Sequence, residues 1–438
     1  MNSNPEPLSP LNDPTATKKK FRYTVVIWLL IGGMINYIDR SVLSIAAPGI
    51  MEELNFTTTD IGVLGTAFSW AYAMGQLPSG WLIDKVGPKK VYGLAVIIWS
   101  GATFAGGLVS SLVVFVMLRI LLGVAEAPAF PASAKITSEW YPKKERGFMS
   151  GIWDSSTKWG PAIAPPILIF IMATFGWREL FYFAGVLGII FGGLFLTFYN
   201  RPEKSKRLSK EELAYIKSDG DNTKELELET KVSWGSLFKY RSVWGMILGY
   251  FCTIWIWNIF LVFLPLYLLD VYNVSFAALG LLASIPWIGG GLGNIAGGYA
   301  TKKMIESGKF SSMKSKQILM SVAALIAGAT VIFMPFVNTI GSTISLMTIA
   351  LFFIAAITGN AWALASDVAP VSMVASVGSI QNFGGYFGGA FSPVVAGIIV
   401  DVTGSYTMAF VSGGIIAACA AIFYFFLVKK PIHEVNAA

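Results

Sequence analysis

The stretch GWLIDKVGPKK, residues 80–90, stands between two long apolar runs and decides how the chain is organised. Gly80 lets two helices approach closely, because glycine carries no side chain. Asp84 lies at the expected end of a helix, beside several lysines. Such a charged cluster can hold neighbouring helices in one arrangement and release them in another. It also fits an ordinary positively charged cytoplasmic loop, so its meaning depends on the rest of the chain.

Apolar runs recur along all 438 residues, and each is long enough to cross a bilayer as a helix of about 20 residues. Hydrophobic residues make up 55% of the chain and charged residues only 13%, whereas about a quarter of a soluble domain is charged. Strands of a membrane barrel would alternate polar and apolar residues, and these runs do not. The sequence therefore predicts an all-α membrane protein with twelve transmembrane helices. We expect them at about 23–47, 60–83, 91–110, 112–134, 147–173, 177–199, 242–269, 276–300, 316–336, 341–366, 371–400 and 404–428.

One long polar connection divides these spans into two sets of six. With the N-terminus inside, all but four of the 32 basic residues fall on the cytoplasmic side, as the positive-inside rule requires. We therefore predict cytoplasmic N- and C-termini in a multi-pass protein of the cell membrane. The basic residues mark topology, so the expected partners are the lipid bilayer and a small ligand, not nucleic acid, and a monomer is the default. The predicted parts are a disordered head (1–22), a first half (23–199), a cytoplasmic linker (200–241), a second half (242–428) and a tail (429–438).

Residue types that carry metal or catalytic chemistry are scarce. His433 in the tail is the only histidine, and the two cysteines, Cys252 and Cys419, form no metal-binding spacing. The glycine-rich stretch GGGLGNIAGG lies in an apolar helix with no strand before it, so it is no nucleotide loop. We expect no catalytic residue, no metal site and no cofactor, and hence no enzyme.

Six ionisable residues lie well inside the predicted spans, all of them in the first half. Each costs about 2.5–3.5 kcal/mol at the centre of a bilayer on insertion scales, so such residues usually face a cavity or a partner. Arg119 and Glu126 are two helical turns apart and share one side of span four. Asp154 and Lys158 are one turn apart and can pair with each other. The six residues are Asp39, Arg40, Arg119, Glu126, Asp154 and Lys158.

These charges allow a structural and a functional interpretation. Neutralised pairs can merely lock helices together, which suits Arg119 and the pair of Asp154 with Lys158. Asp39 and Arg40 fit that interpretation poorly, because adjacent residues of a helix point about 100° apart and cannot serve one partner. A guanidinium group is always charged and binds a carboxylate through two hydrogen bonds. We therefore expect Arg40 to bind an organic anion.

A coupling ion follows from the buried carboxyl groups. Burial favours the protonated form of a carboxyl group, so Asp39 and Glu126 can load and release protons. Two prolines follow Glu126 and are expected to break the helix and leave carbonyl groups open to a cavity. The hypothesis from the residues is symport of an organic anion with protons.

Several motifs resemble a known family. Residues 80–90 resemble the cytoplasmic signature of the major facilitator superfamily, G-x-x-x-D-[RK]-x-G followed by basic residues, with Pro88 at one basic position. The matching place after span eight keeps Gly298 but lacks the acidic residue. The blocks YIDR, FSWAYAMGQLPSGWLID, RILLGVAEAPAFP and SEWYPKKERG look like the anion:cation symporter family, which includes bacterial carriers of galactonate, glucarate and hexuronates. WALASDVAP and SIQNFGGYFGGAFSPVVAGIIVDVTGS also resemble its glucarate and galactonate branch.

The resemblance implies the major facilitator fold, import of a sugar acid with protons by alternating access, and proton-carrying roles for Asp39 and Glu126. It also implies a substrate site. Tyrosines can equally serve packing at a membrane interface. The substrate-binding candidates are Arg40, Tyr37, Tyr72, Thr157, Lys158, Trp362 and Asn382, and the gating or structural candidates are Asp84, Arg119 and Asp154.

Two positions depart from the family pattern. Thr157 stands where galactonate-type carriers tend to have an amide, and Lys158 is an additional cation. Lys158 either forms a second anion-binding point, which would suit a dicarboxylate, or only neutralises Asp154. Span seven is rich in aromatic residues, which would suit an aromatic acid. An organic-anion exchanger, a carrier of aromatic or dicarboxylic acids, and a membrane nutrient sensor therefore stay open as alternatives.

Overall fold

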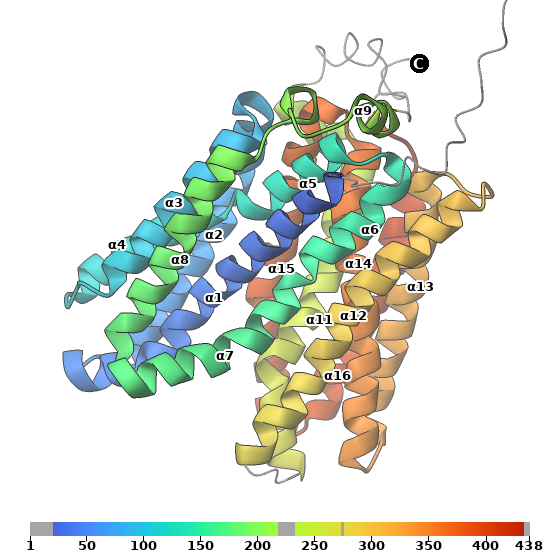
Figure 1. Ribbon diagram of the computed structural model, residues 1–438. Coiled ribbons are helices and arrows are strands. Elements are labelled where there is room, and N and C mark those ends of the chain that lie inside the picture. Colours follow the sequence, from blue (N-terminus) through green and yellow to red (C-terminus); the bar gives the residue numbers. More distant parts are fainter. Residues whose placement is uncertain (1–20, 218–232, 273–275, 433–438) are drawn as a thin grey trace, which may run out of the picture.

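The computed structural model describes residues 21–217, 233–272 and 276–432, and regular structure in these ranges is helical, as predicted (Figure 1). The first half holds α1 (Arg22–Leu54), α2 (Thr58–Val86), α3 (Pro88–Gly106), α4 (Leu112–Glu126), α5 (Ala129–Trp140), α6 (Lys143–Asp154), α7 (Ser156–Phe175) and α8 (Trp177–Phe198). The second half holds α11 (Arg241–Tyr272), α12 (Phe276–Glu306), α13 (Ser312–Phe333), α14 (Ile340–Val368), α15 (Val374–Thr403) and α16 (Tyr406–Ile422). Short helices are η2 (Pro202–Lys204), α9 (Lys210–Ile216), η4 (Trp234–Lys239), η5 (Met334–Phe336), η6 (Val371–Met373) and η7 (Phe423–Leu427).

Helices occupy all twelve predicted ranges, two of them as pairs of helices in line. Span four is divided into α4 and α5 at Pro128, which confirms the expected break after Glu126. Span five is divided into α6 and α7 at Ser155, a break that the sequence analysis did not anticipate. By length and apolar composition alone, nine segments of the described ranges could cross a membrane.

The signature stretch forms a sharp turn between α2 and α3. Gly87 has a backbone φ of 101°, a conformation that residues other than glycine rarely adopt, and it ends α2. Pro88 then takes the first position of α3, where its missing N–H group is no loss. The proline that departs from the family signature is therefore a helix-starting residue.

Two helix bundles meet at the end that carries the linker, the predicted cytoplasmic side. There, α2 and α5 contact α15, and α6 contacts α12 and α14. Toward the opposite end, which we call the far end, the helices of the two bundles lean apart (Figure 1).

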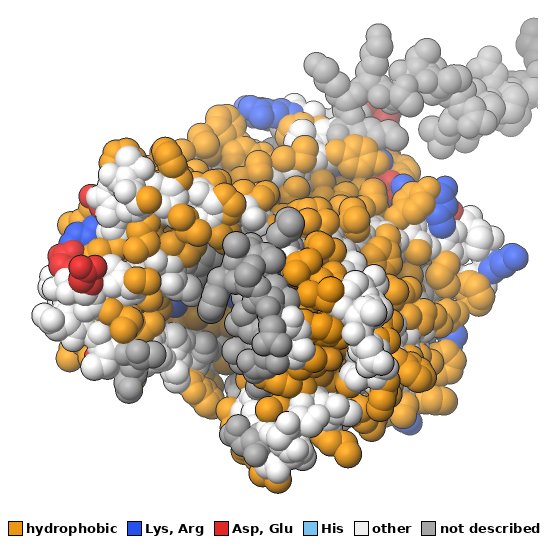
Figure 2. All heavy atoms as spheres, turned by 90° about the horizontal axis from the view of Figure 1, so that it is seen from below, with side chains coloured by type: hydrophobic (Ala, Val, Ile, Leu, Met, Phe, Trp, Pro, Cys, Tyr) orange, Lys and Arg blue, Asp and Glu red, His pale blue; other side chains and the backbone are white. Residues whose placement is uncertain are grey.

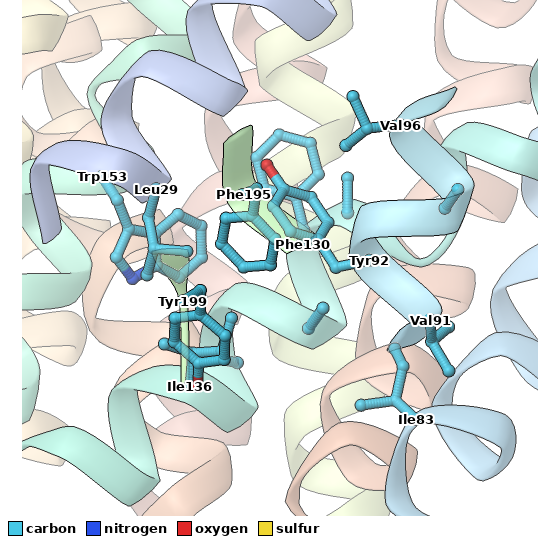
Figure 3. Packing of buried hydrophobic residues seen from close by; sticks show 14 of the residues in the cluster. Leu29, Ile83, Val91, Tyr92, Val96, Phe130, Ile136, Trp153, Phe195 and Tyr199 are labelled. Carbon is cyan, nitrogen blue, oxygen red and sulfur yellow. The ribbon is translucent and has the colours of Figure 1, made fainter. Parts of the chain in front are cut away.

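Each bundle has its own buried core. In the first half, aromatic rings from α3 and α8 pack together (Figure 3). The ring centroids of Tyr92 and Phe195 are 4.9 Å apart at 86°, and those of Phe195 and Tyr199 are 4.8 Å apart and nearly parallel. Outward-facing side chains are also apolar, for example Phe170, which is 67% exposed. Such a surface is suited to lipid tails, in line with the predicted bilayer partner.

The linker docks against the first half. Glu212 in α9 accepts hydrogen bonds from the backbone N–H groups of Phe21 and Arg22 and contacts the Arg22 side chain at 3.1 Å. These N–H groups have no partner within α1, so Glu212 caps that helix. Arg22 also pairs with Glu145 of α6 at 3.1 Å. The predicted disordered head lies outside the described residues up to position 20, as do parts of the linker and tail.

Candidate functional site

A cavity of about 660 Å³ lies between the two bundles. The face at the far end is hollowed between the bundles (Figure 2). The walls of the cavity come from α1, α2, α5, α6 and α7 of the first half and from α11, α12, α14 and α15 of the second half. Among the described residues that line it, the charged side chains are Arg40, Asp154 and Lys158.

Arg40 reaches the cavity from α1. Its guanidinium carbon lies over three aromatic rings, with 4.5 Å to the ring centroid of Tyr72, 5.0 Å to that of Tyr37 and 5.3 Å to that of Phe68. Such ring faces attract a cation and hold it where hydration is poor. The aromatic residues therefore fix the position of the one arginine in this wall.

Both halves of the protein hold the Arg40 guanidinium. Nε donates to Glu126 Oε2 at 2.8 Å, and Nη1 donates to the Tyr386 hydroxyl of α15 at 3.2 Å. Nη2 makes no hydrogen bond to any described residue. The guanidinium thus has a carboxylate partner in the first half and a hydroxyl partner in the second half, and the Arg40 side chain, which is 16% exposed, lines the cavity.

Glu126 lies behind Arg40 and is fully buried at the end of α4. Its second carboxylate oxygen, Oε1, makes no hydrogen bond within the described residues. Removing the Arg40 cation from Glu126 would leave a buried charge without a partner, which is strongly unfavourable. The Arg40 guanidinium is therefore the cation that compensates the buried Glu126 carboxylate in this structure.

Asp39 lies on a different face of α1 from Arg40. It lines a separate small cavity together with Thr103 of α3 and Arg119 of α4. Neither of its carboxylate oxygens makes a hydrogen bond in the described part of the chain. Asp39 and Arg40 therefore face different cavities, as their adjacent positions on the helix predict.

Arg119 supports the wall of the first half. Its Nε donates to the Leu64 carbonyl at 3.3 Å, and its guanidinium lies 4.8 Å from the ring centroid of Phe68. It does not line the central cavity. Its predicted gating or structural role remains a prediction, and its contacts suit that role better than direct binding.

Asp154 and Lys158 pair at 3.2 Å across the break between α6 and α7. The pair also reaches the second half, which the sequence did not indicate. Asp154 Oδ2 accepts from Asn294 Nδ2 of α12 at 2.8 Å and from the Thr358 hydroxyl of α14 at 2.7 Å. The Lys158 ammonium lies 4.8 Å from the ring centroid of Trp257. These polar contacts join the two bundles at the cavity wall.

The remaining predicted binding residues have different positions. Tyr37, Thr157, Trp362 and Asn382 line the cavity. Trp362 is packed among aromatic neighbours, including Phe130 at a centroid distance of 6.0 Å with nearly parallel rings. A flat apolar surface therefore lies beside the polar groups.

Tyr72 does not line the cavity, contrary to the expected contact with substrate hydroxyls. The side chain is fully buried, and its ring contacts both the Arg40 guanidinium and the ring of Tyr386, whose centroid is 4.7 Å away. Its position on the face of α2 that meets α15 explains the difference, because the packed second half covers it. In this conformation Tyr72 positions Arg40.

Asp84 closes the linker end. It accepts from the backbone N–H groups of Ala375 and Ser376, at 3.3 and 2.8 Å, and from the Ser376 hydroxyl at 2.7 Å. Lys135 of α5 pairs with Asp84 at 3.2 Å and also donates to the Val371 carbonyl. These contacts run from α2 and α5 to the start of α15, so they hold the two bundles together on that side.

Glycine residues also allow the two bundles to pack closely at the linker end. Gly298 of α12 packs against the backbone of Gly147 in α6, and a side chain at Gly298 would clash with the Gly147 carbonyl. Close approach of these two backbones requires glycine. Gly298, which stands at the signature position of the second half, thus has a packing reason, although the acidic residue of the signature is missing there.

Asp84→Asn is expected to open the linker end about five- to thirtyfold more often, because several hydrogen bonds to a charged acceptor are weakened. A cysteine at Ser379, which packs against Gly80 in this interface, would report the opening through its labelling rate with a water-soluble maleimide. The two native cysteines would be replaced by serine.

Asp60→Asn is the matched control for this prediction, because Asp60 caps the opposite end of α2. It should leave the labelling rate unchanged. Equal labelling rates in the Asp84→Asn variant and the parent protein would contradict a latch role for Asp84.

Sequence reasoning missed several residues of the site. Tyr386 is four residues after Asn382 and shares its helix face, so helical spacing could have found it. Asn294 and Thr358 carried no comparable signal. A buried pair of Lys316 and Asp367, at 2.6 Å in the second half, was also missed because Lys316 lies at a span end.

Metal binding finds no support in the described residues, where no group of three or more potential ligands of the His, Cys, Asp or Glu type occurs. The arrangement is instead a cavity between two bundles, closed at one end and lined by a paired arginine and a paired lysine. It can bind a small anion and exchange internal ion pairs for ligand contacts.

Comparison with known proteins identifies the family. The model of the Major Facilitator Superfamily matches residues 29–393. A protein of Escherichia coli (strain K12) named "Probable L-galactonate transporter" is 36% identical over 417 residues, which cover 95% of this chain and 91% of that protein. The "Probable galactarate/D-glucarate transporter GudP" of the same strain is 32% identical, with 93% of each chain covered.

A solved structure agrees with this assignment at the level of the fold. The proton:xylose symporter XylE bound to 6-bromo-6-deoxy-D-glucose has a TM-score of 0.76, with 95% of this chain and 98% of that chain covered, at 16% identity. This likeness shows the helical architecture and confirms the predicted fold class. The chain belongs to the Major Facilitator Superfamily and is a multi-pass membrane transporter, not an enzyme.

Proposed function

We propose that this transporter imports a sugar-acid anion together with protons by alternating access. The observation that carries the proposal is the Arg40 guanidinium, which faces the cavity between the bundles with Glu126 as its internal partner at 2.8 Å. A guanidinium group in that position recognises a carboxylate. Two relatives are named as probable transporters of L-galactonate and of galactarate/D-glucarate, and these names support the same class of ligand.

Hydroxyl groups of the ligand have partners in the same wall. Tyr37, Thr157 and Asn382 line the cavity and offer hydroxyl and amide groups. The amide nitrogen of Asn382 makes no hydrogen bond within the described residues, so a ligand oxygen can be its partner. Trp362 supplies a flat surface for the carbon chain.

Proton coupling follows from the exchange of partners at Arg40. A substrate carboxylate that takes the Arg40 guanidinium leaves Glu126 buried without its cation, and a proton then neutralises Glu126. Asp39, in its own small cavity near Arg119, is the second proton carrier. We propose no cofactor beyond the coupling proton, a monomer as the working unit, and the cell membrane as its location.

The closed linker end and the open far end correspond to one of the two states that alternating access requires. Binding at a site between two bundles lets the bundles rock around the ligand. The contacts of Asp84 hold the observed state, and their release would open the opposite side.

The test is a thermal-shift screen of purified protein with sugar acids, dicarboxylic acids, aromatic acids, neutral sugars and organic cations. Stabilisation by sugar acids, followed by uptake into proteoliposomes that increases with an inward proton gradient, is expected. Stabilisation by neutral sugars or cations alone would contradict the proposal. Stabilisation by aromatic acids alone would mean that the site binds aromatic acids. Exchange that does not depend on the proton gradient would contradict proton coupling.

A further inference from the structure

The cavity carries two cations, and each has its own carboxylate partner. Arg40 pairs with Glu126 at 2.8 Å and Lys158 pairs with Asp154 at 3.2 Å. Lys158 is only 2% exposed although it lines the cavity, so its charge is held in a poorly hydrated place. The sugar-acid transport proposed above requires only the first pair, Arg40 and Glu126.

Tyr37 connects the two pairs in space. Its ring centroid is 5.0 Å from the Arg40 guanidinium carbon. On its other side, α7 approaches so closely that a side chain atom placed on Gly160 would lie 2.5 Å from Tyr37 Cβ. Arg40, Tyr37 and Lys158 all line the same cavity, so one ligand in that cavity can meet both cations.

Surroundings of Lys158 suit an exchange of partners. Asp154 Oδ2 accepts hydrogen bonds from the Asn294 amide of α12, from the Thr358 hydroxyl of α14 and from the Lys158 ammonium. The carboxyl group therefore keeps two hydrogen-bond partners when Lys158 turns to a ligand. Thr358 and Asn294 also carry oxygen atoms that can accept a hydrogen bond from a protonated Asp154.

We propose that Lys158 is a second carboxylate-binding point and that the preferred substrate is a dicarboxylic sugar acid. This inference rests on the proposed function, because it adds a second anionic group to the ligand of Arg40. One substrate carboxylate replaces Glu126 at Arg40, and the other replaces Asp154 at Lys158. Each displaced carboxylate takes one proton from the side of entry and returns it on the other side. The cavity then keeps the same net charge with and without the ligand.

A count of protons follows from this exchange. A monocarboxylate displaces Glu126 alone, whereas a dicarboxylate displaces Asp154 as well. Transport of the dicarboxylate therefore takes one more proton per molecule. The groups that face Asp154 are Lys158 from α7, Asn294 from α12 and Thr358 from α14, and Tyr37 and Tyr250 line the same cavity, so Lys158 is the cation paired with Asp154 among them.

The experiment compares galactarate, a dicarboxylate, with galactonate, a monocarboxylate of equal chain length. Binding to the full-length protein is measured by calorimetry, and proton uptake per substrate is measured in proteoliposomes. The variants are Lys158→Gln, the double variant Asp154→Asn with Lys158→Gln, and Lys158→Arg. The double variant removes both charges together, so that no buried ion is left unpaired if the single variant fails to fold.

The double variant is expected to bind galactarate about ten- to a hundredfold more weakly and galactonate within about threefold of the parent protein. It should also take the same number of protons with both acids, whereas the parent takes one more with galactarate. Lys158→Arg should keep most of the galactarate affinity.

Equal weakening for both acids would overturn the proposal and make the pair an inter-bundle latch. No weakening for either acid, or equal proton counts in the parent protein, would overturn it as well. A parent protein that binds neither acid would contradict the proposed function itself, which is a different outcome from failure of the second binding point.

Discussion

Arg40→Ala is expected to weaken sugar-acid binding by at least a hundredfold and to abolish uptake. The alanine removes a cation that stands at the cavity wall and that can form two charge-assisted hydrogen bonds with a carboxylate. Each such bond contributes about 1.5–3 kcal/mol, and a factor of ten in affinity corresponds to about 1.4 kcal/mol. The measurement is calorimetric titration of the purified variant with galactonate.

Controls separate lost binding from lost folding. Arg40→Lys keeps the charge but loses the planar fork, so it should bind more weakly than the parent and more tightly than the alanine variant. Arg40→Gln combined with Glu126→Gln leaves no unpaired charge and should fold without binding. Arg207→Ala changes an exposed arginine at the linker and should bind normally. If the Arg40→Ala variant bound galactonate within threefold of the parent affinity, Arg40 would not be a substrate-binding residue.

Glu126→Gln is expected to reduce proton-driven uptake by more than tenfold while exchange of internal for external substrate continues. The amide keeps the shape of the side chain and can still accept from Arg40 Nε, so the binding site stays assembled. It can no longer take up or release a proton. Uptake driven by a pH gradient and counterflow without a gradient, measured in the same proteoliposomes, separate these two effects.

Glu53→Gln is the matched control for this change. Glu53 pairs with Arg178 at 2.7 Å at the far end and is about half exposed, outside the cavity. It should leave uptake and counterflow unchanged. Loss of counterflow together with uptake in the Glu126→Gln variant would assign Glu126 to the binding site and not to coupling alone.

The prediction of helices succeeded because it depends on local properties. Apolar runs longer than a bilayer is thick can satisfy their backbone groups only as helices. Glycine and proline act on the same local scale, as the turn at Gly87 and the break at Pro128 illustrate. Even so, the break at Ser155 escaped notice, because no proline or glycine stands there.

Prediction of the site was partial. Spacing along one helix assigned Asp39 and Arg40 to different faces, and the structure confirms that separation. Spacing also paired Asp154 with Lys158. Tyr72 was expected at the substrate, but it packs behind Arg40, because its depth in a span does not say which helix will cover it.

Local pattern thus established an all-helical membrane protein and the buried charges that need partners, and it predicts the orientation. Tertiary structure decided which groups those partners are. Arg40 meets Glu126, 86 residues away, and Tyr386, 346 residues away, and Asp154 meets Thr358, 204 residues away. Helical periodicity determines which side chains share a face, but only the packing of the two bundles determines which face lies opposite. For this reason the link of Lys158 and Asp154 to the second half, and with it the second carboxylate-binding point, became visible only in three dimensions.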